Sequence, residues 1–213
     1  MEIQVALDRI PLERAVQITA EVAQHVDWIE VGTSLVKQYG VAGLLAVVES
    51  AGRTPVLADL KTVDDVRFEL ALAFDAGARS ATVLGLAPQV TLDTAVEVCA
   101  GRERELVVDL MGLSARQIEA LAERLPHSVV LAPHVSKDAQ GGAERVTDLL
   151  GPWAEGRRIA LAGGLTADDL PALADRPDLR VIVGSAVTKS PNPIHAVDEL
   201  RRASGRENEQ HDR

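Results

Sequence analysis

The chain has 213 residues and a mass of 22.7 kDa; 46% of its residues are hydrophobic, 25% are charged and only 2% are aromatic. This balance excludes a disordered chain and predicts a soluble globular protein with a core of aliphatic side chains. The net charge of −10, without any large cluster of basic residues, disfavours binding to nucleic acids and anionic membranes. We therefore expect neither as a partner.

Two further features bear on the cellular compartment. The single cysteine, Cys99, excludes a disulfide framework and a zinc site built from cysteines. The first ten residues, MEIQVALDRI, carry acidic side chains and only a short apolar run, unlike a signal peptide. No stretch reaches the roughly 18 apolar residues of a membrane span. We expect a cytoplasmic protein.

Short apolar runs recur at a steady interval along the chain. Each is rich in Val, Ile and Leu, and most are continuous rather than alternating, which is typical of strands buried on both faces of a parallel sheet. The eight runs cover residues 3–7, 28–32, 55–60, 80–85, 105–110, 128–132, 158–164 and 180–185.

The segments between these runs show helical spacing of apolar residues, clearest within 12–23, 66–74 and 118–125. Residues typical of helix starts are Thr33-Ser34, Asp64-Asp65, Ser114 and Thr166. Residues typical of helix ends are Gly52, Gly77, Gly101 and Gly151-Pro152.

The alternation of eight strands with eight helices predicts an α/β fold, a single (β/α)8 or TIM barrel, over residues 1–204. An open doubly wound sheet is the alternative, but no Gly-x-Gly-x-x-Gly follows the first strand. The chain shows no linker and no second domain. We expect the polar residues 205–213 to form a disordered tail.

Acidic residues gather at the predicted carboxyl ends of the strands, where such barrels place their active sites. These residues are Asp8, Glu30, Asp59, Asp64 and Asp109. Brought together, they would raise one another's pKa unless a positive charge lies among them. Lys61 is one candidate, and a divalent cation, Mg²⁺ or Mn²⁺, is the other, because an oxygen-rich ligand set suits these ions.

Some of these residues also have purely structural explanations. Asp59 and Lys61 lie two positions apart, which on a regular strand places both side chains on one face. A buried salt-bridge network closing the barrel explains this pair as well as catalysis does. Asp64 and Asp65 stand where a helix should begin, and ordinary helix caps explain them at least as well as a catalytic role for Asp64. Trp28 has the parity of Glu30 and is expected to fill the barrel beneath it.

Two glycine turns form a second group of candidates. Gly163-Gly164 follows the seventh predicted strand, and Gly184-Ser185 follows the eighth. In (β/α)8 barrels the loops at these positions often bind phosphate through backbone N–H groups, and glycine permits a close approach. We predict that Gly163, Gly164, Gly184 and Ser185 bind phosphate, with plain tight turns as the alternative.

Of the five histidines, only His134 follows a predicted strand, where it opens the polar run HVSKDAQ (134–140). Imidazole exchanges protons near neutral pH, which makes His134 a candidate acid or base. A lone histidine is also commonly structural, and the residues alone leave both alternatives open.

Several of these segments together resemble a known family, the orotidine monophosphate decarboxylase suprafamily. The resemblance is greatest to its 3-hexulose-6-phosphate synthase and 3-keto-L-gulonate-6-phosphate decarboxylase branch and covers nearly the whole chain. Its most specific part is the Asp-x-Lys-x-x-Asp motif of Asp59, Lys61 and Asp64. The segments are QVALD (4–8), IEVGT (29–33), LADLKTVD (57–64), TVLG (82–85), VVDLMG (107–112), HVSKDAQ (134–140) and LAGGL (161–165).

The resemblance implies a role for each candidate. Glu30 stands where the orotidine decarboxylases place a lysine, and in the sugar-phosphate branch this glutamate holds Mg²⁺ together with Asp59. Lys61, kept cationic by Asp59 and Asp64, would stabilise an oxyanion. His134 would carry a proton, and Asp8 and Asp109 would position substrate hydroxyls. The resemblance also implies a homodimer with shared active sites, in which Asp64 reaches the site of the neighbouring subunit.

The implied reaction is a Mg²⁺-dependent carbon–carbon lyase reaction on a ketose phosphate through a cis-enediolate. Asp109 and Ala162 resemble the synthases, which add formaldehyde to D-ribulose 5-phosphate; 3-keto-L-gulonate-6-phosphate decarboxylation is the alternative. Two features depart from the family pattern, namely Asp65-Val66 after the motif and the lack of an arginine in the turn at 184–185. A non-catalytic sugar-phosphate binding protein is a further alternative.

Overall fold

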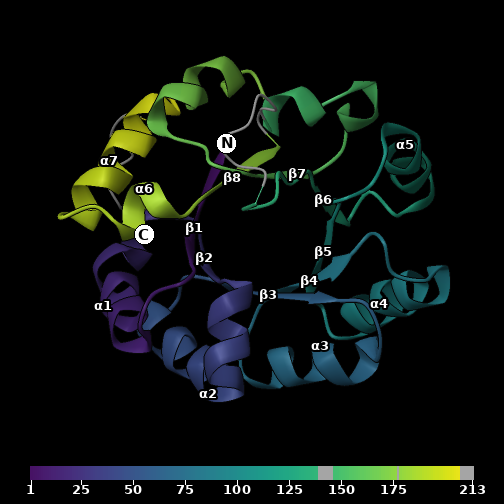
Figure 1. Ribbon diagram of the computed structural model, residues 1–213, viewed down its shortest axis with the longest axis horizontal. Helices are drawn as coiled ribbons and strands as arrows, with labels where there is room; N and C mark the ends of the chain where they lie inside the picture. The colour runs from purple at the N-terminus through teal and green to yellow at the C-terminus, as the bar shows by residue number, and fades with distance from the viewer. Residues whose placement is uncertain (139–145, 177, 207–213) are drawn as a thin grey trace.

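The computed structural model describes residues 1–138, 146–176 and 178–206. It confirms the predicted barrel, in which eight parallel strands close in the order β1 to β8 and helices surround them (Figure 1). All eight predicted strands are present. They are β1 (Glu2–Leu7), β2 (Trp28–Val31), β3 (Val56–Thr62), β4 (Ser80–Leu84), β5 (Glu105–Asp109), β6 (Val130–Ala132), β7 (Ile159–Ala162) and β8 (Leu179–Val183).

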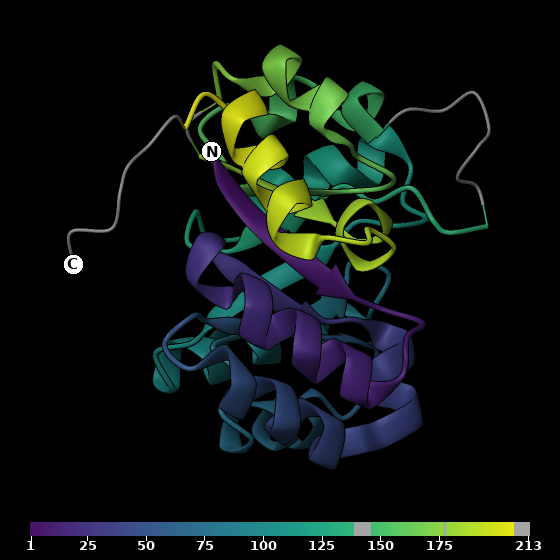
Figure 2. The ribbon, with the colours of Figure 1, turned by 90° about the vertical axis from the view of Figure 1, so that its left-hand side faces the viewer.

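The α-helices form the outer layer, and α7 packs against α1 where the last β/α unit of the chain meets the first (Figure 2). At this seam β1 pairs with both β2 and β8. The α-helices are α1 (Leu12–Val22), α2 (Thr33–Ala51), α3 (Val66–Asp75), α4 (Gln89–Gly101), α5 (Ala115–Arg124), α6 (Ser185–Thr188) and α7 (Pro193–Ala203).

One sequence expectation is wrong: not every strand of the described chain is followed by an α-helix. After β6 and β7 the described residues form short 3-10 helices. Proline explains part of the difference, because it lacks the N–H of an α-helical hydrogen bond: Pro152 starts one of these helices and Pro171 lies within another. The 3-10 helices are η1 (Ala23–His25), η2 (Val146–Leu149), η3 (Pro152–Ala154) and η4 (Ala167–Leu173).

Two separate apolar layers explain why the strand sequences are continuous runs. Side chains such as Ile3, Val5 and Val181 face outward and pack beneath the helices. The alternate side chains face inward and fill the barrel; this inner group is Trp28, Leu57, Val107, Val130, Ala132, Ala160 and Ile182. Each strand thus buries both faces, and Trp28 lies inside the barrel as predicted.

The strand register stacks the inward-facing polar residues in layers along the barrel axis. Glu2 is paired with Arg180 at the lower, amino-terminal end of the strands. One layer higher, Gln4 is paired with Trp28 and with Ile182. The next layer contains Glu30, which is paired with Ala6. The polar residues predicted to be functional therefore stand above an apolar layer that closes the barrel beneath them.

The boundary predicted near residue 204 stays a prediction, since residues 207–213 lie outside the described part of the chain. Arg206, which the sequence assigns to the tail, forms an ion pair with Asp27. Its guanidinium donates to both carboxylate oxygens of Asp27.

Candidate active site

A cavity of about 450 Å³ opens at the carboxyl ends of the strands. A larger one, about 600 Å³, lies among the segments that lead into β7 and β8, at the opposite end of the barrel. We place the candidate site in the smaller cavity, because barrels of this fold carry out their chemistry at the carboxyl ends. Its lining includes the predicted residues Asp8, Glu30, Asp59, Lys61, His134, Gly163, Gly164 and Gly184.

The Lys61 ammonium lies between two carboxylates. Its Nζ is 2.6 Å from Oδ2 of Asp109 and 3.1 Å from Oδ1 of Asp59. Burial alone would lower the pKa of Lys61, but the charges of Asp59 and Asp109 raise it above its usual value. Lys61 is therefore a fixed cation at neutral pH and not a base.

The backbone at Lys61 departs from a regular strand. Lys61 has φ of 50°, in the left-handed region, and the pairing of β3 with β4 shifts register between Ala58 and Thr62. Its N–H donates to Oγ1 of Thr82 at 2.9 Å, and that hydroxyl donates to Oδ1 of Asp59 at 2.8 Å. The two side chains thus meet as expected, but the alternation of a regular strand does not account for it.

Asp109 connects the cation to His134. Oδ2 of Asp109 lies 3.0 Å from Nδ1 of His134, and Oδ1 accepts the N–H of Met111 at 2.9 Å. Burial would raise the pKa of Asp109, but the hydrogen bond from His134 and the charge of Lys61 lower it to about 2. Because an ionised carboxylate only accepts hydrogen bonds, Nδ1 of His134 carries the hydrogen of this contact.

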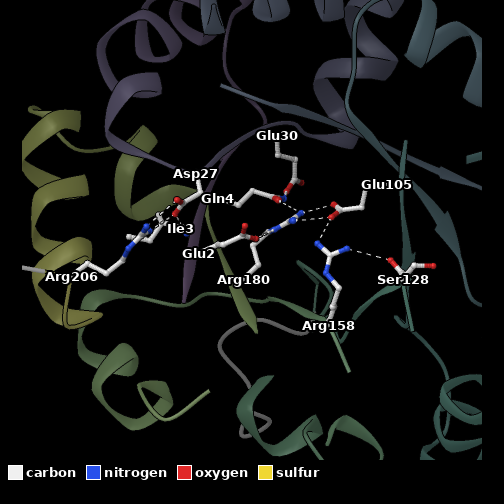
Figure 3. A network of polar contacts seen from close by, with 10 residues as sticks. All are labelled: Glu2, Ile3, Gln4, Asp27, Glu30, Glu105, Ser128, Arg158, Arg180 and Arg206. Atoms are coloured by element: carbon white, nitrogen blue, oxygen red, sulfur yellow. Dashed lines mark hydrogen bonds and ion pairs between the residues drawn. The ribbon is translucent and has the colours of Figure 1, made fainter. Parts of the chain in front are cut away.

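Glu30 is a buried carboxyl group of the cavity that forms no ion pair with the described residues. It is 8% exposed, and burial together with the nearby charge of Asp59 raises its pKa to about 8. Nε2 of Gln4 donates to its Oε2 at 2.5 Å (Figure 3). A divalent cation beside Glu30 and Asp59 would relieve this burial of like charges.

The donor set fits Mg²⁺ or Mn²⁺ through two carboxylates, Glu30 and Asp59. Mg²⁺ commonly keeps several waters and takes only one or two carboxylates from the protein. The residues that the structure describes contain no group of three or more His, Cys, Asp or Glu arranged to hold a metal. Asp59 is also oriented from its other side, because Oγ1 of Thr33 donates to its Oδ2 at 2.5 Å.

Asp8 is held by the start of α2. The backbone N–H of Ser34 donates to Oδ1 of Asp8 at 3.0 Å, and the Ser34 hydroxyl donates to the same oxygen. Gly32 permits this contact: a Cβ there would lie 2.7 Å from the carbonyl oxygen of Leu7 and 2.8 Å from Cβ of Asp8. The sequence alone indicates Thr33 and Ser34 only as a helix start.

Asp64 stands apart from the other predicted residues. It is exposed, it does not line the cavity, and its Oδ1 accepts the N–H of Asp65 at 2.8 Å. Within one chain, Asp109 rather than Asp64 is the second carboxylate on Lys61. The expectation that Asp64 holds Lys61 is therefore corrected for the single chain.

The predicted phosphate-binding turns divide in a similar way. Gly163 and Gly164 have φ of 144° and 75°, values that favour glycine, and both line the cavity with Gly184. Ser185 is exposed at the first position of α6 and is not part of the lining. Of the polar run after His134, residues 136–138 line the cavity, whereas residues 139–140 lie outside the described part of the chain.

Sequence comparison agrees with this geometry. The family model described as Orotidine 5'-phosphate decarboxylase / HUMPS matches residues 1–200. The chain belongs to this family.

The most informative relatives are 3-hexulose-6-phosphate synthases. The protein of that name from Mycobacterium gastri is 33% identical over 207 residues, covering 95% of this chain and 99% of the relative. The one from Bacillus subtilis is 30% identical over 209 residues, covering 95% and 98%. These relatives confirm the enzyme class expected from the sequence, a carbon–carbon lyase.

Solved structures show the same relationship. The 3-hexulose-6-phosphate synthase of Salmonella typhimurium superimposes with a TM-score of 0.88 at 31% identity, over 98% of this chain and 100% of that one. The 3-keto-L-gulonate-6-phosphate decarboxylase of Vibrio cholerae has a TM-score of 0.82 at 25% identity, over 96% and 97%.

Among the described residues, none of the helices is both long and apolar enough to cross a membrane.

Proposed function

We propose that the protein is a Mg²⁺-dependent 3-hexulose-6-phosphate synthase, which joins formaldehyde to D-ribulose 5-phosphate by aldol addition. One observation carries the proposal: a half-buried lysine held between two aspartates shares a cavity with a buried glutamate of raised pKa and a histidine. The names of the synthase relatives support this choice of substrate. The cytoplasmic location of the protein stays a prediction.

The chain's own residues supply the proton chemistry. Because Nδ1 of His134 carries the hydrogen shared with Asp109, Nε2 of the neutral ring has the lone pair. We assign to Nε2 the removal of the proton from C1 of the ketose phosphate. The resulting enediolate carbon attacks the formaldehyde carbon and forms the new C–C bond, while the C=O π electrons move to the oxygen. The alkoxide that results takes the proton from Nε2 of His134, which returns the imidazole to its neutral form.

The charge that develops on the substrate oxygens needs positive partners. Lys61 is held in place by Asp59 and Asp109, so it stabilises an oxyanion without first reorganising. When bound by Glu30 and Asp59, Mg²⁺ would supply Lewis-acid polarisation of neighbouring substrate oxygens. Asp8, which lines the cavity, would position a substrate hydroxyl, and the turns at Gly163, Gly164 and Gly184 would hold the phosphate. Asp109 and Ser185 do not line the cavity, and Asp109 instead holds Lys61 and His134 in place.

The direct test is an assay of the purified protein with two substrates. We expect formaldehyde-dependent consumption of D-ribulose 5-phosphate, lost in EDTA and restored by Mg²⁺ or Mn²⁺. Release of CO₂ from 3-keto-L-gulonate 6-phosphate without formaldehyde fixation would instead identify the decarboxylase. Binding of ribulose 5-phosphate without either turnover would identify a non-catalytic sugar-phosphate binding protein. Full activity in EDTA would remove the metal from the proposal.

We propose in addition that two chains share their active sites. Asp64 lies beside exposed apolar side chains: Val63 is 43% exposed, Phe68 60% and Leu72 40%. Further exposed apolar residues on α2 and around α4 are Val41, Leu45, Leu86 and Val90. Exposed apolar side chains on helices that contact one another, α2 with α3 and α3 with α4, would favour burial against a second copy. Asp64, next to Val63 in the chain, would then reach the partner's cavity.

Subunit mixing tests the shared site. Lys61→Ala and Asp64→Ala proteins should each be nearly inactive. After subunit exchange, a mixed dimer has one site with both changes and one intact site, so statistical mixing should restore roughly a quarter of wild-type activity. Activity that stays absent after proven exchange would mean that Asp64 acts within its own chain or only at the start of α3.

A further inference from the structure

A second charged cluster lies inside the barrel, below the candidate site. Its centre is Arg180 on β8, which is 2% exposed. The guanidinium donates through NH1 and NH2 to the two oxygens of Glu105 at 2.9 and 3.1 Å, and through Nε to Glu2 at 2.9 Å (Figure 3). It also lies 4.0 Å from the ring centre of Trp28. We call Glu2, Glu105, Arg158 and Arg180 the lower cluster.

These contacts fix the guanidinium more firmly than a single ion pair would. Two parallel hydrogen bonds to one carboxylate set the plane of the group, and the Trp28 ring supports its face. Arg158 donates to Oε2 of Glu105 at 2.6 Å and so holds that carboxylate from its other side. Arg180 is therefore an immobile donor in the barrel interior.

Gln4 connects this cluster to the candidate site. It is fully buried, one layer above Arg180 and one below Glu30. Its Oε1 lies 3.4 Å from NH1 of Arg180, and its Nε2 lies 2.5 Å from Oε2 of Glu30. Figure 3 shows the amide between the two groups.

The chemistry of the three groups allows only one orientation of the amide. Arg180 has donors and no acceptor, so it can contact only the oxygen of the amide, and Glu30 offers an acceptor oxygen to the NH₂ whether it is ionised or protonated. With the amide turned over, its NH₂ would face the guanidinium, and that contact would be repulsive. Arg180 thus directs the NH₂ of Gln4 at Glu30, which fixes the plane of the Glu30 carboxylate.

We propose that Arg180 is a positioning residue that acts through Gln4 to orient Glu30 for metal binding. The inference rests on the proposed function, in which Glu30 is a metal ligand. It adds a connection about which the resemblance says nothing. Groups that orient metal ligands typically change metal affinity 10- to 100-fold when they are removed.

Two variants test the connection at its two ends. Gln4→Met removes the amide and leaves the ion pairs of Arg180 intact, and Arg180→Met removes the donor that orients the amide. In metal-free crystals of both we expect the Glu30 carboxylate to be rotated from its wild-type position. In solution, Mn²⁺ affinity, measured by electron paramagnetic resonance of the free ion, should fall about tenfold in each.

The double variant and two controls separate this role from general destabilisation. Because both residues act on one path, Gln4→Met/Arg180→Met should bind Mn²⁺ no more weakly than either single variant. Arg158→Met is the matched control: it also removes a partner of Glu105, but one that donates to the Ser128 carbonyl instead of to Gln4, and it should retain wild-type affinity. If Arg180→Met fails to fold, Arg180→Met/Glu105→Met replaces the buried pair without leaving a buried unpaired charge, because Glu2 and Arg158, which lose a partner, have side chains that are 44% exposed.

The possible results are distinct. A Glu30 carboxylate that keeps its position in the Arg180 variant, with wild-type Mn²⁺ affinity, overturns the proposal. Two tenfold losses that multiply to about 100-fold in the double variant also overturn the proposal, because Arg180 would then act by a route independent of Gln4. Equal Mn²⁺ affinity of wild type and Glu30→Gln contradicts the metal site of the proposed function, while rotation of Glu30 in the crystals would still support the positioning role.

Discussion

Two charged clusters share the interior of this barrel, and they differ in charge balance. The lower cluster sets two arginines against two glutamates. The upper cluster sets Lys61 against three buried carboxyl groups, those of Glu30, Asp59 and Asp109. Asp8 is paired separately, because its Oδ2 lies 3.9 Å from Nε of Arg9. The lower cluster is electrically complete, whereas the upper cluster has an excess of acid.

This difference in charge balance indicates a structural role for the lower cluster and a chemical role for the upper cluster. Arg180 satisfies its partners and packs on Trp28, as a group does when it holds strands together. In the upper cluster Lys61 contacts Asp59 and Asp109, whereas burial and the charge of Asp59 raise the pKa of Glu30 to about 8. An acid that the protein itself does not neutralise is the feature that a metal ion or a substrate would complete.

The largest effect is expected when the cation of the upper cluster is removed. Lys61→Met should lower kcat/KM for formaldehyde addition by a factor on the order of 1,000, because a preorganised positive charge near the developing oxyanion is lost. Steady-state kinetics on protein with wild-type circular dichroism would measure this. Retention of more than a tenth of the activity would mean that Lys61 is only a structural partner of Asp59 and Asp109.

Glu30→Gln should come next. It preserves shape and removes one metal ligand, so activity should fall on the order of 100-fold and Mg²⁺ should bind more weakly. Metal titrations of activity would show the shift. Unchanged metal dependence in this variant would exclude Glu30 as a ligand.

The same variant has a pH signature in the metal-free protein. Glu30 has a folded-state pKa of about 8, above its ordinary value of 4.5, so the folded protein binds more protons than the unfolded chain between these pH values. The free energy of unfolding should therefore fall as pH rises from about 4.5 to 8, by a few kcal/mol in order of magnitude. Urea unfolding in EDTA should show this slope for wild type and a flatter one for Glu30→Gln.

A smaller effect is expected at the rim of the cavity. Gly164→Val places a branched side chain at φ of 75° and blocks the approach of an anion to the backbone, so KM should rise about tenfold with less change in kcat. Gly52→Val is the matched control, since φ is 62° there and a Cβ at that position would have no neighbouring atom within 4 Å. A similar rise in KM for both variants would point to backbone strain instead of a phosphate site.

The smallest effect is expected in the lower cluster. The Arg158 side chain is 44% exposed, so Arg158→Met should change the free energy of unfolding by less than about 1 kcal/mol and leave kcat/KM unaltered. Chemical denaturation and kinetics would check both. A large loss of activity would show that the two clusters are more tightly coupled than their charge balance indicates.

The strands are well predicted from the sequence because each must bury both faces, which leaves a strong apolar signal. The α-helices predicted after β6 and β7 are wrong in the described residues, where apolar spacing does not reveal a change to 3-10 geometry. The site residues at strand ends can be named because closing the barrel brings those ends together. The partners of these residues cannot be named in the same way. Gln4 and Thr82 lie in segments that carry the family resemblance, but a polar residue within a strand does not show which side chain it will contact.

Conformation and charge compensation are equally hidden. The left-handed backbone of Lys61 is unexpected for a lysine in a strand, and regular alternation accidentally suggests the same convergence with Asp59. Which carboxylate holds Lys61 depends on the placement of β5 next to β4, so the sequence does not distinguish Asp109 from Asp64. For Arg180 it indicates only the first residue of a strand.

The position of Arg180 has a consequence for how the chain folds during synthesis. The guanidinium joins Glu2 on the first strand to Glu105 on the fifth, yet it is made on the eighth, 178 residues after Glu2. During synthesis, Glu2 and Glu105 are therefore made before Arg180, and of the two arginines of the lower cluster only Arg158 is made in time to reach Glu105 before β8. A barrel that lacks β8 would leave the buried Glu105 carboxylate without its two hydrogen bonds from Arg180, which favours completion of the ring.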